Sequence, residues 1–147
     1  MIKTIRALSR KKMTAMAPEL LRDPASYIIS ITDPRDEPIF DKETERCTLL
    51  QFHDIDTMIN GYILCDAMHG DQIITLLERA HAASVFVDVW VNCEAGMSRS
   101  GAVAAFVQQH YMLEWGTFQR LNPGIYPNIH VKTMLREAME RRNGQVG

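Results

Sequence analysis

The chain has 147 residues, a formal net charge of −2, 46% hydrophobic residues and 23% charged residues. This length suits a single domain over residues 1–147 with a substantial core. The slightly acidic balance argues against binding to long nucleic acids, which attract proteins with a clear basic excess. No apolar run approaches the ~20 residues of a membrane span, and the N-terminus lacks the apolar centre of a secretory signal. We therefore expect a protein that is not held in a membrane.

The three cysteines, Cys47, Cys65 and Cys93, are odd in number and widely separated. Such a set fits a reducing cytoplasm better than a disulfide framework, so a cytoplasmic location is expected. The five histidines are scattered, and no histidine or cysteine spacing matches a metal site. Neither a metal nor another cofactor is expected.

The first part of the chain predicts a strand, a helix and a second strand. Residues 2–5 are suited to a short strand. Ser9 is a suitable N-cap, and the helix that follows it, over 11–16, is expected to end at Pro18. Residues 26–32 are apolar and β-prone, which is typical of a strand.

The middle of the chain predicts a third strand, a helix and a central strand. Residues 47–52 are β-prone, whereas the pattern over 60–70 gives no clear register. Apolar side chains recur at helical spacing over 71–83. The run 85–91 is apolar except for Asp88, and so short a run is typical of a strand buried on both faces.

The last part of the chain predicts two helices. Residues 100–113 begin with small apolar residues suited to close packing on a sheet, and Trp115 after them is expected to fill the core. Asn128 is a natural N-cap for a final helix with an apolar stripe that extends to Met139. Because strands alternate with helices, we expect an α/β fold with a mostly parallel sheet of four to five strands and helices on both faces. Its core is expected over about residues 26–140.

The chemistry is concentrated between the central strand and the next helix. This segment reads Cys93, Glu94, Ala95, Gly96, Met97, Ser98, Arg99, Ser100. A loop that curls before a helix N-terminus points backbone N–H groups into one concavity, where the helix dipole adds positive potential. Such a concavity suits phosphate, and Arg99 can bind two phosphate oxygens. The residues from Glu94 to Arg99 are therefore the predicted phosphate-binding loop.

The same electrostatic field favours a thiolate at Cys93, which makes this residue the predicted nucleophile. Ser100 is placed to hydrogen-bond the sulfur and help it leave. Cys93 would attack phosphorus, and water would then hydrolyse the cysteinyl-phosphate. In the alternative interpretation, Cys93 is a buried core thiol and Arg99 an ordinary surface charge. The strand before the loop and the small-residue helix after it favour the chemical interpretation.

The segment from Cys93 to Ser100 resembles the signature loop of the cysteine-dependent protein tyrosine and dual-specificity phosphatases, most closely small bacterial or phage-type members. The resemblance extends from about Ser26 to Met139. It implies a phosphatase-like domain that hydrolyses phosphomonoesters, with a phosphorylated protein or a small phosphomonoester as substrate. Family members usually carry histidine just before the nucleophile. Asn92 stands there instead, which predicts a less stabilised thiolate and slower turnover at acidic pH.

The resemblance also implies a general acid on a loop that follows an upstream strand. A carboxylic acid there protonates the leaving oxygen and then activates the hydrolytic water. Asp54 is preferred because it directly follows the strand and matches the second aspartate of the Phe-Asp-Asp segment of phage-like members, with His53 in place of the first. Asp56 and Asp66 remain alternatives, because the gap from Asp54 to Cys93 is longer than usual in the family. In the alternative interpretation, these acids have no catalytic role and only keep the loop hydrated.

Other functions compete with protein phosphatase activity. Rhodanese and arsenate reductase also place an anion above a thiolate, but rhodanese loops usually lack the Gly-x-x-Arg-Ser pattern. An arsenate reductase would need Cys47 or Cys65 as a resolving thiol. A catalytically weak pseudophosphatase that only binds phosphorylated partners is the alternative from another class, and Asn92 gives it weight. Substrate preference depends on the rim of the site, expected over 33–45 and 54–70.

Overall fold

The computed structural model describes residues 1–146, which form four strands and five helices. In chain order these are β1 (Ile2–Leu8), α1 (Arg10–Arg22), β2 (Ser26–Thr32), β3 (Cys47–Gln51), α2 (Ala67–Ala82), β4 (Val87–Asn92), α3 (Arg99–His110), α4 (Trp115–Leu121) and α5 (Ile129–Val146). No helix within residues 1–146 combines the length and the apolar character needed to cross a bilayer.

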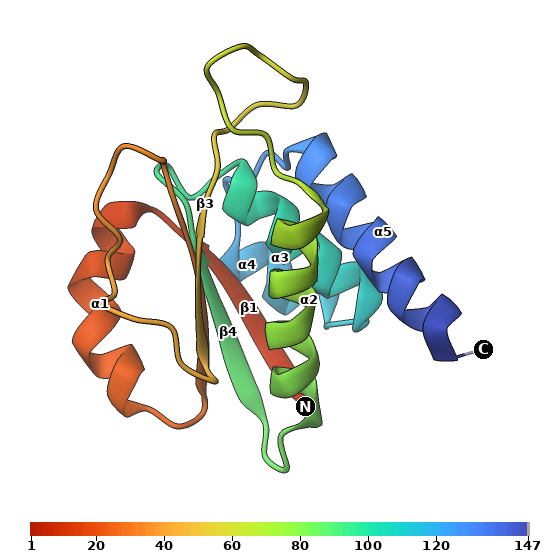
Figure 1. The fold of residues 1–147 in the computed structure, drawn as a ribbon. Helices are drawn as coiled ribbons and strands as arrows, with labels where there is room; N and C mark the ends of the chain where they lie inside the picture. Colours follow the sequence, from red (N-terminus) through yellow and green to blue (C-terminus); the bar gives the residue numbers. More distant parts are fainter. Residues whose placement is uncertain (147) are drawn as a thin grey trace.

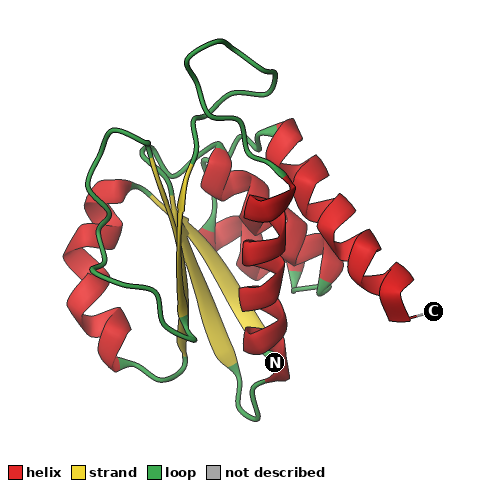
Figure 2. Ribbon diagram, viewed as in Figure 1, coloured by secondary structure: helices red, strands yellow, loops and turns green. Residues whose placement is uncertain are grey.

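The four strands form one parallel sheet in the order β1-β4-β2-β3. Helix α1 covers one face, and α2, α3, α4 and α5 lie on the other (Figures 1 and 2). The predicted α/β architecture with helices on both faces is thus confirmed, with the smaller of the two expected strand numbers. Because every strand runs the same way, all four carboxyl ends meet at one edge, where such sheets bind ligands.

The sheet separates two apolar clusters. The larger one, between the sheet and helices α2 to α5, contains the β4 side chains Val87, Val89 and Val91. The smaller one lies under α1 and includes Met13 and Leu20. Burial of each such side chain stabilises the fold by about 1.5–3 kcal/mol relative to exposure. The central strand β4 is therefore fixed from both sides, and so is the position of the loop that follows it.

Helix α1 does not end at Pro18 as predicted. Pro18 lies inside the helix, which continues to Arg22, whereas the predicted N-cap is confirmed by the hydrogen bond from the Lys12 N–H to the Ser9 hydroxyl. A proline removes one intrahelical hydrogen bond and strains the turn before it. Here Ala17 and Leu20 are buried against the sheet, so packing on either side of Pro18 outweighs that cost.

Three predicted core residues lie at the surface. Val85 and Phe86, expected in the central strand, are 60% and 67% exposed, because β4 begins only at Val87, where its pairing with Ile2 of β1 begins. Trp115, expected to fill the core, is 55% exposed and opens the short helix α4. The side chain that α4 buries is Phe118, against which the Trp115 ring stacks.

The boundaries of two helices also differ from those that the apolar periodicity predicted. Helix α2 starts at Ala67 rather than residue 71, because Asp66 accepts the His69 N–H and caps an extra turn. Helix α3 ends at His110, and Met112 beyond it has a positive φ of 55° that no helix adopts.

Strand β3 is one edge of the sheet, and the segment before it partly covers that edge. The Glu43 carboxylate accepts the Leu49 N–H at 3.1 Å and lies 3.4 Å from the Thr48 hydroxyl. Thr44 forms an antiparallel bridge with Cys47 at the start of the strand. The outer hydrogen-bonding groups of β3 are thus partly occupied by its own chain.

Candidate active site

The loop 93–98 joins the carboxyl end of β4 to the N-terminus of α3. Gly96 at its centre has a φ of +75°, and a Cβ atom there would lie 2.5 Å from the backbone of Leu8 and Ser9. Only glycine fits so close an approach in this left-handed conformation. The loop is therefore pressed onto the junction between β1 and α1, which explains the glycine in the motif.

The carbonyl oxygens of the loop are held by groups outside it. Three N–H groups bind them, from Arg10 to Glu94 (3.0 Å), from Tyr126 to Met97 (2.8 Å) and from Asn128 to Ser98 (3.1 Å). None of the N–H groups of residues 94–98 donates a hydrogen bond to another part of the described chain, 1–146. Five unpaired N–H groups beside a helix N-terminus suit an anion.

Cys93 lies at the start of this loop and is 2% exposed. Its Sγ atom is 3.1 Å from the Ser100 hydroxyl, as the sequence predicted for a serine that assists the sulfur. Asn92 before it is fully buried and makes a long 3.5 Å contact from Nδ2 to the Cys93 carbonyl. The Oδ1 atom of Asn92 has no partner within residues 1–146.

Arg99 is 4% exposed, so it is not an ordinary surface charge. One terminal nitrogen donates to the Asp33 carboxylate at 2.6 Å and to the Phe52 carbonyl at 2.8 Å. Its Nε atom is buried and has no partner among the described residues. An unpaired buried N–H of a guanidinium is costly, and an oxyanion above the loop would satisfy it.

Asp33 was not singled out from the sequence, which placed it only in the expected rim. It directly follows β2, the neighbour of β4, so parallel pairing brings it to the same edge as the loop. A carboxylate directly after a buried strand was the signal available for it. Paired with Arg99, Asp33 fixes the guanidinium in one orientation.

Asp54 contacts the loop, whereas the other two acids do not. Its Oδ1 atom accepts hydrogen bonds from the Ser98 hydroxyl at 2.8 Å and from Asn128 Nδ2 at 2.9 Å. Asp66 instead caps α2, and Asp56 makes no hydrogen bond or ion pair in the described part of the chain. Asp54 lies on the segment 53–63, which projects beyond the carboxyl end of the sheet (Figure 1).

Asn128 has a role that the sequence did not predict. Its Oδ1 atom accepts the Val131 N–H at 3.0 Å, which confirms the expected cap of α5. Its Nδ2 atom also binds the Ile55 carbonyl at 3.1 Å in addition to Asp54. One side chain thus joins the final helix to the acid-bearing segment and holds Asp54 against the loop.

Carboxylates also gather beside the loop. One oxygen from each of Asp33, Asp36 and Glu94 lies within 4.8 Å of the others. Carboxylate oxygens are ligands that hard cations prefer, but Asp36 and Glu94 are exposed and Asp33 already binds Arg99. We interpret the group as a concentration of negative charge at the rim of the site.

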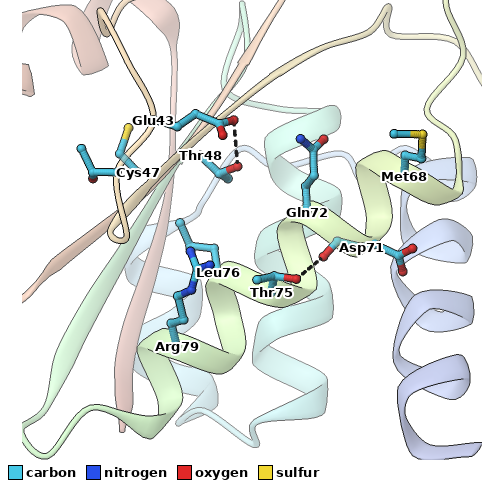
Figure 3. A pocket seen from close by; sticks show the side chains of 10 residues that line it. Glu43, Cys47, Thr48, Met68, Asp71, Gln72, Thr75, Leu76 and Arg79 are labelled. Atoms are coloured by element: carbon cyan, nitrogen blue, oxygen red, sulfur yellow. Dashed lines mark hydrogen bonds between the residues drawn. The ribbon is translucent and has the colours of Figure 1, made fainter. Parts of the chain in front are cut away.

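The other two cysteines lie apart from the loop. Burial, followed by the charge of Glu43, raises the pKa of Cys47 to about 11. Burial and then Asp66 raise the pKa of Cys65 to about 12. Cys47 lines a cavity of about 390 Å³ between β3 and α2, where Asp71 and Arg79 also lie (Figure 3). None of the residues that line this cavity belongs to the loop.

Comparison of the sequence with protein families and with characterised proteins finds no match. Among solved structures, the chain is similar to human DUSP28, with a TM-score of 0.57 and 18% identity over 96% of this chain and 94% of that one. It is also similar to PTPMT1 in complex with PI(5)P, with a TM-score of 0.52 and 17% identity over 98% and 95% of the two chains. At these identities the similarity concerns the fold. The chain has the fold of the cysteine-dependent phosphatases of the protein tyrosine and dual-specificity type.

Proposed function

We propose that this protein hydrolyses phosphomonoesters through a cysteinyl-phosphate intermediate, as a protein tyrosine or dual-specificity phosphatase. The observation that carries the proposal is the buried Arg99, whose Nε has no partner among the described residues and which opens the helix after a loop of unpaired N–H groups. Cys93 lies at the start of that loop. The whole chain would act as one catalytic domain, and three unbridged thiols suit a reducing compartment such as the cytoplasm.

In the first step, the loop N–H groups and Arg99 bind three phosphoryl oxygens. Asp33 and the Phe52 carbonyl hold the guanidinium in place, so little reorganisation is needed in the transition state. The Cys93 thiolate attacks phosphorus, a sulfur–phosphorus bond forms, and the bond to the leaving oxygen breaks. Asp54, held at the loop by Ser98 and Asn128, donates the proton that this oxygen needs.

In the second step, water attacks the cysteinyl-phosphate. Asp54, now ionised, accepts a proton from that water. The sulfur–phosphorus bond breaks and inorganic phosphate leaves. The Ser100 hydroxyl, 3.1 Å from Sγ, donates a hydrogen bond that stabilises the departing thiolate. Neither step uses Asn92, which would act on the thiolate only through the loop backbone.

A direct test is hydrolysis of p-nitrophenyl phosphate and of phosphotyrosine peptides by the purified protein. We expect release of nitrophenolate and phosphate, and a radiolabelled phosphoprotein after an acid quench of the reaction with labelled phosphopeptide. Both signals should disappear in Cys93→Ser. Phosphate release that persists in Cys93→Ser would contradict the mechanism, and the matched variant Cys47→Ala should keep both signals.

A binding module without turnover is the second candidate, because of Asn92. Its buried Oδ1 has no partner within residues 1–146, so the hydrogen-bonding capacity of the residue before the proposed nucleophile is only partly used. Binding of a phosphopeptide without phosphate release would support this candidate. Arsenate reduction is disfavoured, since the buried Cys47 and Cys65 are unsuited to act as resolving thiols.

A further inference from the structure

The segments that surround the phosphate loop carry an excess of negative charge. Six carboxylates lie on residues 9–12, 33–37, 52–56 and 93–99, against three arginines and two exposed lysines, Lys11 and Lys12. The carboxylates belong to Asp33, Asp36, Glu37, Asp54, Asp56 and Glu94, and the arginines are Arg10, Arg35 and Arg99. The carboxylates outnumber the basic residues by only one, so the position of each carboxylate relative to the loop decides which charge a ligand meets.

Contacts place four of these carboxylates at the loop itself. Asp33 binds Arg99, and one oxygen of Asp33, of Asp36 and of Glu94 lie within 4.8 Å of each other. Asp54, on the segment that follows β3, accepts a hydrogen bond from the Ser98 hydroxyl of the loop. Three of the four, Asp36, Glu94 and Asp54, are exposed, so they act on any ligand that approaches the loop.

The groups that attract an anion lie deeper than this acidic rim. Arg99 is 4% exposed, and its unpartnered Nε and the unpaired loop N–H groups, judged within residues 1–146, can hold one phosphoryl group. Of the other arginines, Arg10 donates one terminal nitrogen to the Glu37 carbonyl while its buried Nη1 has no partner among the described residues, and Arg35 is exposed. The site therefore offers room for one anion at the bottom, and the exposed Asp36 and Glu94 repel further anions at the rim.

Resting on the phosphatase function proposed above, we propose that this site selects phosphorylated protein segments with lysine or arginine beside the phosphorylated residue. Basic side chains there pair with the exposed Asp36 and Glu94, which otherwise repel the incoming phosphoryl group. Ligands with several phosphates or an anionic membrane surface meet that repulsion without compensation. The acidic rim thus separates basic phosphoproteins from phosphoinositides.

The test measures binding to Cys93→Ser, which removes turnover as a variable. Three probes are compared by fluorescence anisotropy or competition: a phosphotyrosine peptide with flanking lysines, the same peptide with flanking glutamates, and soluble short-chain phosphatidylinositol 5-phosphate. We expect the lysine peptide to bind about tenfold more tightly than the glutamate peptide at low salt, because several exposed ion pairs contribute. At 1 M salt, where the Debye length is about 3 Å, the two peptides should bind almost equally.

Charge variants identify the source of the preference. In the Cys93→Ser background, Asp36→Asn should reduce the ratio of the two affinities by about twofold to threefold, and Asp36→Lys should reduce it further. Glu19→Gln removes an equal charge from an exposed position near the far end of α1 and should leave the ratio unchanged. Matching melting temperatures would show that these surface variants are folded.

Equal binding of both peptides, tighter binding of the glutamate peptide or the phosphoinositide, or failure to bind any probe would overturn the inference. Hydrolysis of p-nitrophenyl phosphate by the unmodified protein tests the proposed function separately. A chain that hydrolyses this small ester without charge preference would keep the function and lose the inference. A chain that binds the basic peptide more tightly but hydrolyses no ester would keep the charge preference and lose the proposed phosphatase function.

Discussion

Two regions of the molecule each enclose cysteine at almost the same degree of burial. Cys93 in the loop after β4 is 2% exposed, and Cys47 and Cys65, in the apolar clusters on the two faces of the sheet, are each 1% exposed. Their surroundings differ. Cys93 has a hydroxyl at 3.1 Å and unpaired N–H groups, within residues 1–146, in its own loop. Cys47 has Glu43 and apolar side chains around it.

Burial alone does not mark a nucleophile. Removing a thiol from water disfavours its anion, and burial accordingly raises the pKa of Cys47 and of Cys65. Only in the loop do hydrogen-bond donors replace the lost water. Cys93, the proposed nucleophile, is therefore distinguished by the polar groups around it rather than by its accessibility.

The largest effect is expected for the nucleophile. Cys93→Ser should reduce kcat for p-nitrophenyl phosphate by on the order of 10⁴-fold or more, because the essential attacking group is lost. Cys47→Ala and Cys65→Ala should keep kcat within about twofold, since neither thiol touches the loop. Steady-state kinetics of the three variants checks this, and comparable losses in all three would remove the distinction between the regions.

The next effect concerns the cation beside the loop. Arg99→Lys should lower kcat/KM by about 10²- to 10³-fold, because a lysine cannot hold Asp33 and present a second donor to phosphate. Asp33→Asn should cost less, about tenfold, since the guanidinium stays but loses its charged anchor. Inhibition by inorganic phosphate should weaken in parallel. Unchanged phosphate affinity in Arg99→Lys would mean that Arg99 does not bind the anion.

The proposed general acid, Asp54, is expected to give a smaller and substrate-dependent effect. Asp54→Asn should reduce kcat by about 10²-fold for phosphotyrosine peptides, whose leaving group needs a proton. The loss should be several-fold smaller for p-nitrophenyl phosphate, because nitrophenolate leaves without help. Asp56→Asn is the matched control and should change neither rate. An equal loss for both substrates would assign Asp54 to loop support through Ser98 and Asn128 rather than to proton transfer.

The smallest effect is a pH dependence of stability from the core thiols. The folded state raises the pKa of Cys47 from 9.0 to about 11 and that of Cys65 from 9.0 to about 12. Above pH 9.0 the unfolded chain therefore loses these protons first, so the free energy of unfolding should fall as the pH rises from about 9 towards 11. Urea unfolding at several pH values checks the slope. Cys47→Ala should flatten it, and an unchanged slope would contradict the assignment.

The loop between β4 and α3 could be predicted from the sequence because its parts are contiguous. Strand, cysteine, glycine, arginine and helix follow one another between Val87 and His110, and local geometry fixes their relation. The order of alternating strands and helices likewise predicted a parallel sheet. These features depend on the periodicity of apolar residues and on the local geometry of the turn at Gly96, and both can be recognised in the sequence.

The partners of the loop could not be predicted, because long-range pairing creates them. Asp33 is 66 residues from Arg99, and only the pairing of β2 with β4 brings them together. Asn128 is 74 residues from Asp54. The predictions that Trp115 fills the core and that α1 ends at Pro18 were wrong for a related reason. The burial of Phe118 and of Leu20 decides how α4 and α1 pack.

The covering of strand β3 bears on how the protein behaves at high concentration. An exposed edge strand offers a template to which another chain can add, and sheets that grow in this way precipitate. In this chain the Glu43 carboxylate occupies the Leu49 N–H and brings a negative charge to the edge. Molecules that meet at this edge face that charge on both sides. We therefore expect this charge, together with the Thr44–Cys47 bridge, to disfavour the addition of another strand at β3.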